Sequence, residues 1–501
     1  MAGRVIITLP FGSWLGLSVS RAHYGLSSSI LILLPLLLIT IAVSRSLYRT
    51  ISRARLARKL GCRPPPLEPS SLPLGIDIVL ASLRADREQR TPDHVAARFA
   101  ALGAHTFRLS LLGTTNLVTA DPRNVQAMLA TQFTDFGMGA ARSTNLKAVL
   151  GRSIFAADGP AWRAAREMMR PLFSRDNLFL GQSTHTLEAR LRGDDSHPGT
   201  AFNHAFERML AILGTRMRLR SLYWLYGTAE LRSCVRTLHA FVDDAIAASD
   251  RARSRGSSLA PYDFLDVLRE RCAGGDGEVR EQVLGLLAAG RDTTASLMAW
   301  AWYCLLRDRR VFAKLRAEVL AAFGSSDPAA VSFASLKQCA YLQHVLSETL
   351  RLHSVVPFNS RRALVDTTLP TGGGPDGRSP VFVPAGTEVN FSTHVLHRRR
   401  DLWGDDADDF VPERWETKRG AAGAAWHYVP FNGGPRICIG QQLALTEAGY
   451  VLVRMLQRYD AVEGLDVDAS RDWHNFTVVC SPGSPVDRNE AVLCRLRVAA
   501  R

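Results

Sequence analysis

The sequence predicts a mainly helical α+β protein with small β-sheets at its edges, preceded by one membrane-spanning helix. Apolar residues recur at intervals of three and four, the spacing of a buried helix face, along residues 281–306, 311–323 and 336–352. Strand-like pieces are short and lie at residues 106–111, 381–383 and 491–498, with a glycine-rich turn at 372–377. A single long apolar run lies near the N-terminus. Because helical patterns dominate the rest, the sheets are expected to be minor.

The apolar run covers residues 24–44 and carries no charge. About 20 predominantly apolar residues are enough to cross a bilayer. Seven basic residues and no acidic one follow between positions 45 and 63, whereas only Arg4 and Arg21 precede the run. Positive charge favours the cytosolic side, so the C-terminal part is expected in the cytosol. A cleaved signal peptide is the alternative, but its basic flank would stand before the apolar run.

These features divide the chain into four predicted segments. We expect a short lumenal segment over residues 1–23 and a transmembrane anchor over 24–44. A basic, proline-rich linker follows over 45–66, and one globular domain occupies 67–501. No second span and no convincing internal repeat interrupts that domain, which predicts a single-pass membrane protein.

Composition narrows the class of protein. The chain has 501 residues, of which 47% are hydrophobic and 22% charged, as in globular proteins. The net charge of +14 suits an anionic membrane surface, an acidic protein partner or nucleic acid. Because the basic residues are scattered and not interleaved with stacking aromatics, no nucleic-acid partner is expected. The eight cysteines form no CxxC motif, which favours free thiols in a reducing compartment.

The most informative motif is a cysteine between a glycine-rich loop and a helical pattern. Residues 431–440 read Phe-Asn-Gly-Gly-Pro-Arg-Ile-Cys-Ile-Gly. Backbone N–H groups of the loop and of the following helix can stabilise a thiolate at Cys438. Gly434 and Gly440 allow tight turns and the close approach of a flat cofactor, while Phe431 can shield the sulfur. A buried structural cysteine is the alternative for Cys438 alone, but the ten-residue pattern favours a ligand.

A second motif lies inside the first of the three long helical stretches. Residues 289–294 read Ala-Gly-Arg-Asp-Thr-Thr. Gly290 leaves space beside the helix, and Asp292 and Thr293 offer an acid and a hydroxyl that can pass protons through water. The alternative is a pair on an exposed helix face, which the apolar residues on both sides disfavour.

Two pairs of residues have the spacing of helical neighbours. Glu348 and Arg351 are three residues apart and can form an ion pair on one helix face. Trp162 and Arg166 are four apart, so their N–H groups can reach a single carboxylate. Either pair alone is also common on protein surfaces.

The pattern Phe-x-x-Gly-x-Arg-x-Cys-x-Gly resembles the haem loop of the cytochrome P-450 superfamily and is matched in full. The resemblance covers roughly residue 67 to the C-terminus. It implies haem b as the cofactor, Cys438 as the axial ligand of its iron, and a loop formed with Phe431, Gly434, Arg436 and Gly440. A thiolate ligand of this kind favours cleavage of the O–O bond.

The same resemblance gives roles to the other motifs. It implies that Arg414, in the segment Pro-Glu-Arg-Trp at 412–415, joins Glu348 and Arg351 in a structural triad behind the haem loop. It implies that haem propionates are bound by four residues, namely Trp162, Arg166, Arg361 and Arg436. It also implies that Asp292 and Thr293 deliver protons during oxygen activation.

The resemblance implies a monooxygenase that inserts one oxygen atom of O2 into a C–H bond of an apolar small molecule. Electrons are expected from an NADPH-dependent reductase carrying FAD and FMN at the endoplasmic reticulum membrane. Residues 356–361, 368–377 and 431–436 resemble a fungal branch that hydroxylates n-alkanes and fatty acids. The expected substrate is therefore long-chain aliphatic, or polyketide- or terpenoid-like, within secondary metabolism or fatty-acid hydroxylation.

One departure from the family pattern concerns the stretch between Trp162 and Asp292, which is several tens of residues shorter than expected. A helix over residues 177–191 is followed closely by residues 202–208, which resemble the helix that roofs the substrate cavity. A strand and a bundle helix are therefore expected to be missing, and each large apolar side chain left uncovered would cost about 1.5–3 kcal/mol. Two alternatives follow, a haem-thiolate isomerase or dehydratase and an inactive membrane protein lacking one bundle helix.

Overall fold

The computed structural model describes residues 28–499 except 112, 174–187, 189–191, 195, 255–263, 273–274, 326–329, 419–423, 466–470 and 485–491. The chain divides into two compact units, residues 1–59 and residues 60–501. Helices dominate both, and the second unit also holds small sheets, which confirms the predicted fold class.

The first unit contains one long helix, α1 (Ser28–Lys59). Its part from Leu33 to Lys59 is long and apolar enough to cross a membrane, and none of its residues is buried. The helix continues through the basic residues that the sequence predicts as linker, because no glycine or proline interrupts the chain between Pro35 and Gly61. Its 32 residues extend about 48 Å, more than the roughly 30 Å hydrocarbon core of a bilayer.

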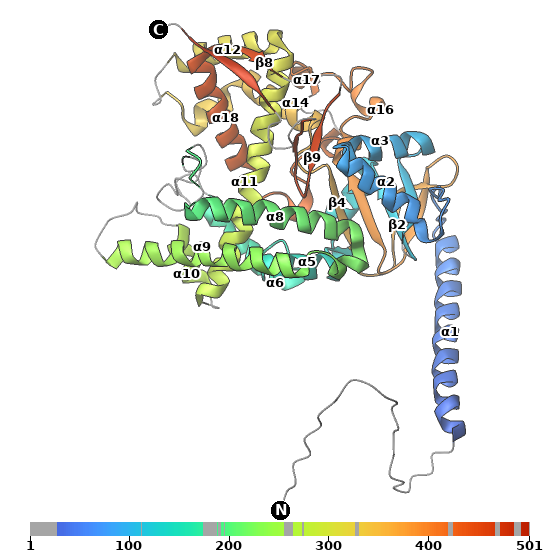
Figure 1. Cartoon of the computed structure of the whole chain (residues 1–501). Helices are drawn as coiled ribbons and strands as arrows, with labels where there is room; N and C mark the ends of the chain where they lie inside the picture. Colours follow the sequence, from blue (N-terminus) through green and yellow to red (C-terminus); the bar gives the residue numbers. More distant parts are fainter. Residues whose placement is uncertain are drawn as a thin grey trace, which may run out of the picture. The chain divides into compact units, whose positions relative to one another are not determined.

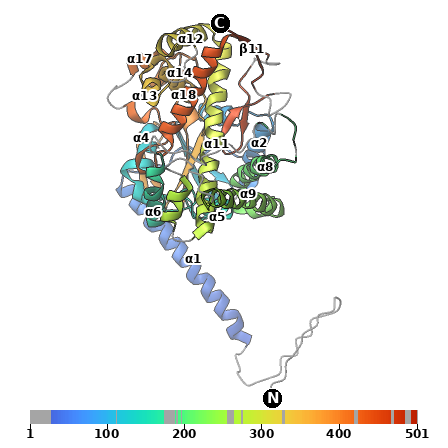
Figure 2. The ribbon, with the colours of Figure 1, turned by 90° about the vertical axis from the view of Figure 1, so that its left-hand side faces the viewer.

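In the second unit, the helix α11 (Gly275–Arg307) is central in both views (Figures 1 and 2). The other helices are α2 (Ile76–Arg87), α3 (Thr91–Leu102), α4 (Pro122–Gln126), α5 (Ala140–Leu150), α6 (Gly159–Met169), α8 (Pro198–Leu219), α9 (Thr228–Ser254), α10 (Phe264–Arg271), α12 (Arg309–Phe323), α13 (Phe333–Gln338), α14 (Ala340–Leu352), α15 (Thr393–Leu396), α16 (Arg400–Trp403), α17 (Arg414–Lys418) and α18 (Gln441–Arg458). Helix α11 packs against α5, α9, α14 and α18, so it contacts helices from both the earlier and the later part of the chain.

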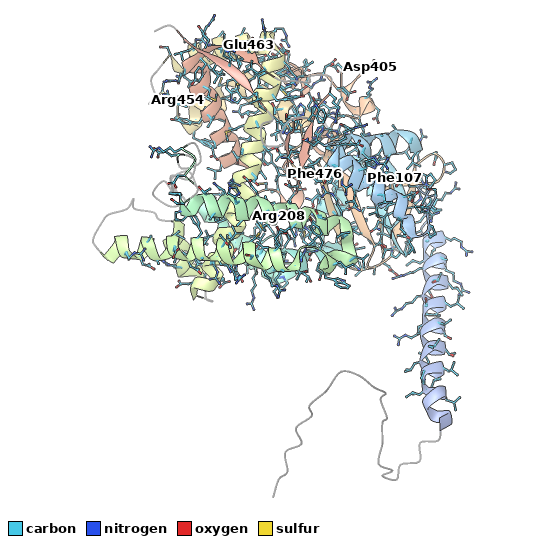
Figure 3. All side chains as sticks on the ribbon, viewed as in Figure 1. Phe107, Arg208, Asp405, Arg454, Glu463 and Phe476 are labelled. Atoms are coloured by element: carbon cyan, nitrogen blue, oxygen red, sulfur yellow. The ribbon has the colours of Figure 1, made fainter. Side chains whose placement is uncertain are left out.

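The largest sheet has five strands in the order β1-β2-β7-β4-β3. Its strands are β1 (Thr106–Leu111), β2 (Thr114–Thr119), β7 (Glu388–Ser392), β4 (Phe358–Ala363) and β3 (Phe136–Gly137). Within this sheet, as described, β2 and β7 pair in parallel and the other neighbouring strands pair antiparallel. Phe107 of β1 is fully buried beside the neighbouring helices (Figure 3).

Three two-stranded sheets complete the fold. They pair β5 (Thr367–Gly373) with β6 (Ser379–Val383), β8 (Tyr459–Gly464) with β11 (Cys494–Val498), and β9 (His474–Phe476) with β10 (Cys480–Pro482). The strand predicted at 106–111 coincides with β1, and the other two predicted strands overlap β6 and β11.

The predicted helices at 281–306 and 311–323 lie within α11 and α12. The stretch predicted as one helix over 336–352 is two helices, because Cys339 has an extended backbone between α13 and α14. A serine, Ser332, caps α13 by accepting a hydrogen bond from the Ser335 amide, so the capping residue starts the helix three residues before the apolar pattern.

Between α6 and α8, the helix expected over residues 177–191 lies outside the described residues, except for Glu188. Helix α8 begins at Pro198 and contains the segment 202–208. It packs against α9, and the two helices lie side by side in both views (Figures 1 and 2).

Candidate haem-thiolate site

The cysteine loop is fixed by backbone contacts. Residues Gly434–Arg436 form a 3-10 turn, and the amide of Cys438 donates a 2.9 Å hydrogen bond to the carbonyl of Phe431 before α18 begins. Gly434 has φ of 63°, and a Cβ there would lie 1.8 Å from the carbonyl oxygen of Leu129. Only glycine can occupy this position, because a side chain would clash with backbone. The cysteine loop therefore packs directly against the helical turn that contains Leu129.

Cys438 is a free cysteine with an exposed side chain. Desolvation nevertheless raises the pKa of its thiol, although a hydrogen bond from the Gly440 amide and the charge of Arg166 oppose this shift. Water therefore reaches the side chain of Cys438, although protein surrounds most of it. The sequence correctly points to stabilising N–H groups, but burial has the larger effect. Binding to a metal ion would deprotonate the thiol.

Arg436 and Arg166 lie on the same indole ring. The guanidinium carbon of Arg436 lies 4.3 Å from the ring centroid of Trp162, and that of Arg166 lies 5.9 Å from it. Arg436 also donates hydrogen bonds to Asp158 Oδ1 at 2.6 Å and to the carbonyl of Ala157 at 3.2 Å. Helix α6 and the cysteine loop are thus joined through cation–π contacts, which bring three of the predicted propionate residues together.

A further pair of arginines stands beside them. Arg361 of β4 and Arg142 of α5 both donate to the side-chain oxygen of Asn359, at 3.2 and 2.8 Å. Burial, together with the charges of Arg142 and Arg436, lowers the pKa of Arg361 to about 9. The Nε atoms of Arg361 and Arg142 are buried and have no hydrogen-bond partner among the described residues.

These arginines show whether the residues present suit a bound haem. Arg142, Arg361 and Arg436 influence one another electrostatically, Asp158 faces all three, and Glu388 also faces Arg142. An interior patch with more cations than anions attracts anionic groups, and the two propionates of haem b supply them. The residues present therefore fit haem with Cys438 as ligand. Arg142 was missed by sequence reasoning, since no local pattern distinguishes it from other basic residues of the chain.

Glu348 is the centre of a buried ionic network. Its carboxylate accepts two hydrogen bonds from Arg351, at 2.8 and 2.9 Å, and one from Arg414 Nε at 2.7 Å. The indole N–H of Trp415 and the amide of Val411 add bonds of 2.9 and 3.0 Å. The structure thus brings the three predicted charged residues together and adds Trp415, which sequence reasoning had not singled out. A buried charge needs this many partners to remain ionised.

The oxygen-activation segment lies in α11. Gly290 is exposed, and a Cβ there would meet nothing within 4 Å, so space is open beside the helix. The hydroxyl of Thr293 donates to the carbonyl of Ala289, four residues earlier. Burial raises the pKa of Asp292.

Asp292 also has a partner that the sequence analysis left without a role. Arg291 donates a 2.8 Å hydrogen bond to Asp292 Oδ1 and a 3.1 Å bond to the side-chain oxygen of Asn203 on α8. Arg291 thereby links the acid to α8, where it also lies 3.8 Å from Glu207, so one cation faces two carboxylates. Asp292 and Thr293 are neighbours, yet their hydroxyl and carboxylate are held by different partners.

Three features together define a haem-thiolate protein. They are the cysteine loop, the group of buried arginines and the open space beside Gly290 in the central helix α11. Comparison with known proteins agrees. The Cytochrome P450 family model matches residues 202–483. The chain belongs to the cytochrome P450 family and is a haem b-dependent monooxygenase of that family.

Three relatives illustrate how much of the chain is shared. "Cytochrome P450 monooxygenase alt2" of Alternaria solani is 61% identical over 92% of this chain and 97% of its own length. "Cytochrome P450 monooxygenase g430" of Fusarium sp is 40% identical over 88% of each chain. "Cytochrome P450 52E1" of Candida apicola is 37% identical over 82% of this chain and 88% of its own.

The comparisons also bear on the short stretch before α8. The aligned region with the Alternaria solani relative is 526 residues long, which exceeds the 501 residues of this chain. Because 92% of this chain is about 460 residues, roughly 65 aligned positions hold a residue only in the relative. The family match begins at Phe202, directly after the short stretch. The start of the family match agrees with the shortened stretch expected before α8.

Proposed function

We propose that the protein hydroxylates a long-chain aliphatic or similarly apolar small molecule. The observation that carries this proposal is the pairing of Arg291 with Asp292 beside the open space at Gly290. Because Arg291 stands between Asp292 and Glu207, 2.8 and 3.8 Å away, the carboxylate of Asp292 is paired and does not face an apolar chain as a lone charge. The resemblance of three segments to the fungal n-alkane and fatty-acid branch supports the same substrate class.

Haem bound at Cys438 supplies reductive activation of dioxygen. In the overall reaction, the substrate, O2, NADPH and a proton give the alcohol, water and NADP+. The protein's part is to hold the haem through Cys438 and the arginines and to deliver protons. In this proposal Thr293 positions a water molecule with its hydroxyl, and Asp292 exchanges protons with solvent when it separates from Arg291. Arg291 would then control how readily the proton is supplied.

Electron supply and location are part of the proposal. The apolar part of α1 and the basic residues after it favour anchoring in the endoplasmic reticulum membrane with the second unit in the cytosol. An NADPH-dependent reductase with FAD and FMN would act from the same side. The net charge of +14 supports encounter with an acidic reductase surface.

One observation favours a second candidate. If roughly 65 residues are missing before α8, part of the helical core could be uncovered, and the protein could be inactive. An isomerase or dehydratase, which needs no external electrons, is less well supported because the Asp292–Thr293 pair suits protonation of dioxygen.

The test uses the full chain in vesicles with an NADPH-dependent reductase. Candidate substrates are dodecanoic acid, hexadecane and a sesquiterpene, and the readouts are hydroxylated product, NADPH consumed and the carbon monoxide difference spectrum. We expect a thiolate spectrum and NADPH-dependent hydroxylation of at least one aliphatic compound. A Cys438→Ser variant should lose both. A thiolate spectrum with rearranged but not oxygenated product would favour the isomerase, and absence of the spectrum would favour the inactive protein.

A further inference from the structure

A cluster of ligand-type side chains lies apart from the cysteine loop, where the C-terminal hairpin meets α11 and α14. His353, Asp472 and His474 each place a ligand atom within 4.8 Å of the others. His353 directly follows α14, and Asp472 and His474 lie two residues apart at the start of β9. Alternate residues of an extended chain share one face, so the hairpin can present both side chains to His353.

The ring nitrogens of this cluster lack partners. His474 is 2% exposed and His353 is 6% exposed. Nδ1 of His353 and both Nδ1 and Nε2 of His474 have no hydrogen-bond partner among the described residues. Buried polar atoms are nearly always paired, so an unpaired ring nitrogen on each of two neighbouring histidines indicates a group that binds between them.

The carboxylate of Asp472 is positioned to join them. Its Oδ1 accepts a 2.6 Å hydrogen bond from the hydroxyl of Tyr303 on α11. Its Oδ2 lies 3.9 Å from Nδ1 of His353 and 3.9 Å from the guanidinium of Arg398, both beyond hydrogen-bond distance. One oxygen is thus anchored while the other remains available as a ligand.

Neighbouring groups hold the imidazole of His353 in place. The ring of Trp300 stacks on it with centroids 4.0 Å apart and planes 7° from parallel. Tyr303 meets the same ring edge-on at 5.6 Å. Metal ligands are typically oriented by such surrounding contacts, which fix ring direction before the ion arrives.

Carboxylates and neutral imidazoles, which are ligand types for divalent metals, meet in this cluster. Asp93 lies 3.7 Å from Nδ1 of His474 and 3.8 Å from Nε2 of His394. Asp93 and Asp472 stand beside histidines that burial keeps neutral, while Arg398, Arg307 and Arg471 also act on these rings. A cation would therefore be held by its ligands and not by surplus negative charge. Both carboxylates are partly exposed, 42% and 34%, which leaves solvent a route to the cluster.

We propose that His353, Asp472 and His474 form a binding site for a divalent transition-metal ion, Zn2+ by its ligand chemistry, separate from the haem. Two imidazoles and a carboxylate are a common zinc ligand set, with water or Asp93 able to complete four ligands. The ligand atoms would close by small side-chain rotations to the roughly 2.0–2.1 Å metal distances of such sites. The ion would tie the β9–β10 hairpin to α11 and α14.

The test measures zinc in the haem-loaded full chain, after growth with added zinc and dialysis into metal-free buffer. Elemental analysis should give one zinc per haem. Zinc X-ray absorption, which the haem iron does not disturb, should show nitrogen and oxygen neighbours at about 2.0 Å. His474→Gln and Asp472→Asn should each bind Zn2+ at least tenfold more weakly. His204→Gln, which alters an exposed histidine on α8, should bind zinc like the unchanged protein.

A milder variant keeps the proposal testable if a ligand substitution prevents folding. Tyr303→Phe removes only the hydrogen bond to Asp472 and should weaken zinc binding by about 10–100-fold while the haem spectrum persists. The proposal is overturned if the unchanged protein holds no zinc above the buffer blank. It is also overturned if zinc has sulfur neighbours at about 2.3 Å, or if Asp472→Asn binds zinc unchanged.

Discussion

Arg351 lies one helical turn after Glu348 and binds its carboxylate in a two-pronged arrangement. Nε donates to Oε2 at 2.9 Å and a terminal nitrogen donates to Oε1 at 2.8 Å, with both side chains 0% exposed. The remaining donors of Arg351 reach the carbonyls of His397, Ala407 and Asp409. The arginine therefore joins α14 to the loop between α15 and α17, which is the arrangement we expect of a structural ion pair.

We expect Glu348→Gln to destabilise the protein by about 3–5 kcal/mol, because the buried guanidinium of Arg351 loses its counter-charge and that of Arg414 keeps only Asp406. The free energy of unfolding, measured by urea denaturation of the haem-loaded protein, checks this. The matched control is Glu230→Gln, which breaks an exposed ion pair with Arg208 on α8 (Figure 3) and should cost far less stability. Equal losses in both variants would contradict the prediction.

Acid should destabilise the protein partly through His397. Its Nε2 accepts a 2.9 Å hydrogen bond from the Val429 amide, and burial together with nearby arginines lowers its pKa to about 3. The unfolded residue has a pKa near 6.5, so between about pH 6.5 and 3 the unfolded state binds more protons than the folded state. The stabilisation is therefore complete above pH 6.5 and is lost as pH falls through this window.

The variant His397→Gln isolates this contribution, because its amide oxygen can still accept the Val429 bond. Between pH 5.5 and 4.5 the unfolding free energy should fall by about 1.3 kcal/mol less than in the unchanged protein, and between pH 7.5 and 5.5 by about 0.7 kcal/mol less per pH unit. His353, His394 and His474 have pKa values lowered by burial in the same direction, so some slope should remain. An unchanged slope would contradict the assignment to His397.

Thr293→Ala should divert electrons from product into hydrogen peroxide while leaving the thiolate spectrum intact. Positioned proton transfer contributes about 10²–10⁴-fold, and without the hydroxyl the water beside α11 loses its anchor. The measurement is product and peroxide per NADPH with the best substrate of the panel above. Thr446→Ala is the control, because it removes the same kind of bond to the carbonyl four residues earlier on the exposed face of α18. Unchanged coupling in Thr293→Ala would mean that water or Thr294 positions the proton.

Deleting residues 1–44 should move the protein toward the soluble fraction and preserve the thiolate spectrum, since residues 60–501 form a compact unit. Vesicle flotation at low and high salt measures membrane attachment. A truncated chain that still floats at high salt would show a second apolar attachment surface.

The sequence was informative where function depends on short spacing. Glu348 and Arg351 share one helix, and the ten residues around Cys438 carry their own pattern, so both could be recognised without a fold. Arg142, Trp415 and the link from Arg291 to Asn203 could not be, because tertiary packing brings distant segments together. The extension of α1 through the predicted linker has a local cause, since charged side chains do not stop a helix.

The network around Glu348 also implies an order of events during synthesis. Its carboxylate binds donors at positions 351, 411, 414 and 415, and so closes a loop of more than 60 residues. Closing such a loop costs roughly 4 kcal/mol of chain entropy, which several bonds at one carboxylate can offset together. Arg414 and Trp415 leave the ribosome before Cys438. The network around Glu348 can therefore form before Cys438, the proposed iron ligand, emerges. Haem would then bind to a protein in which the network around Glu348 has already formed.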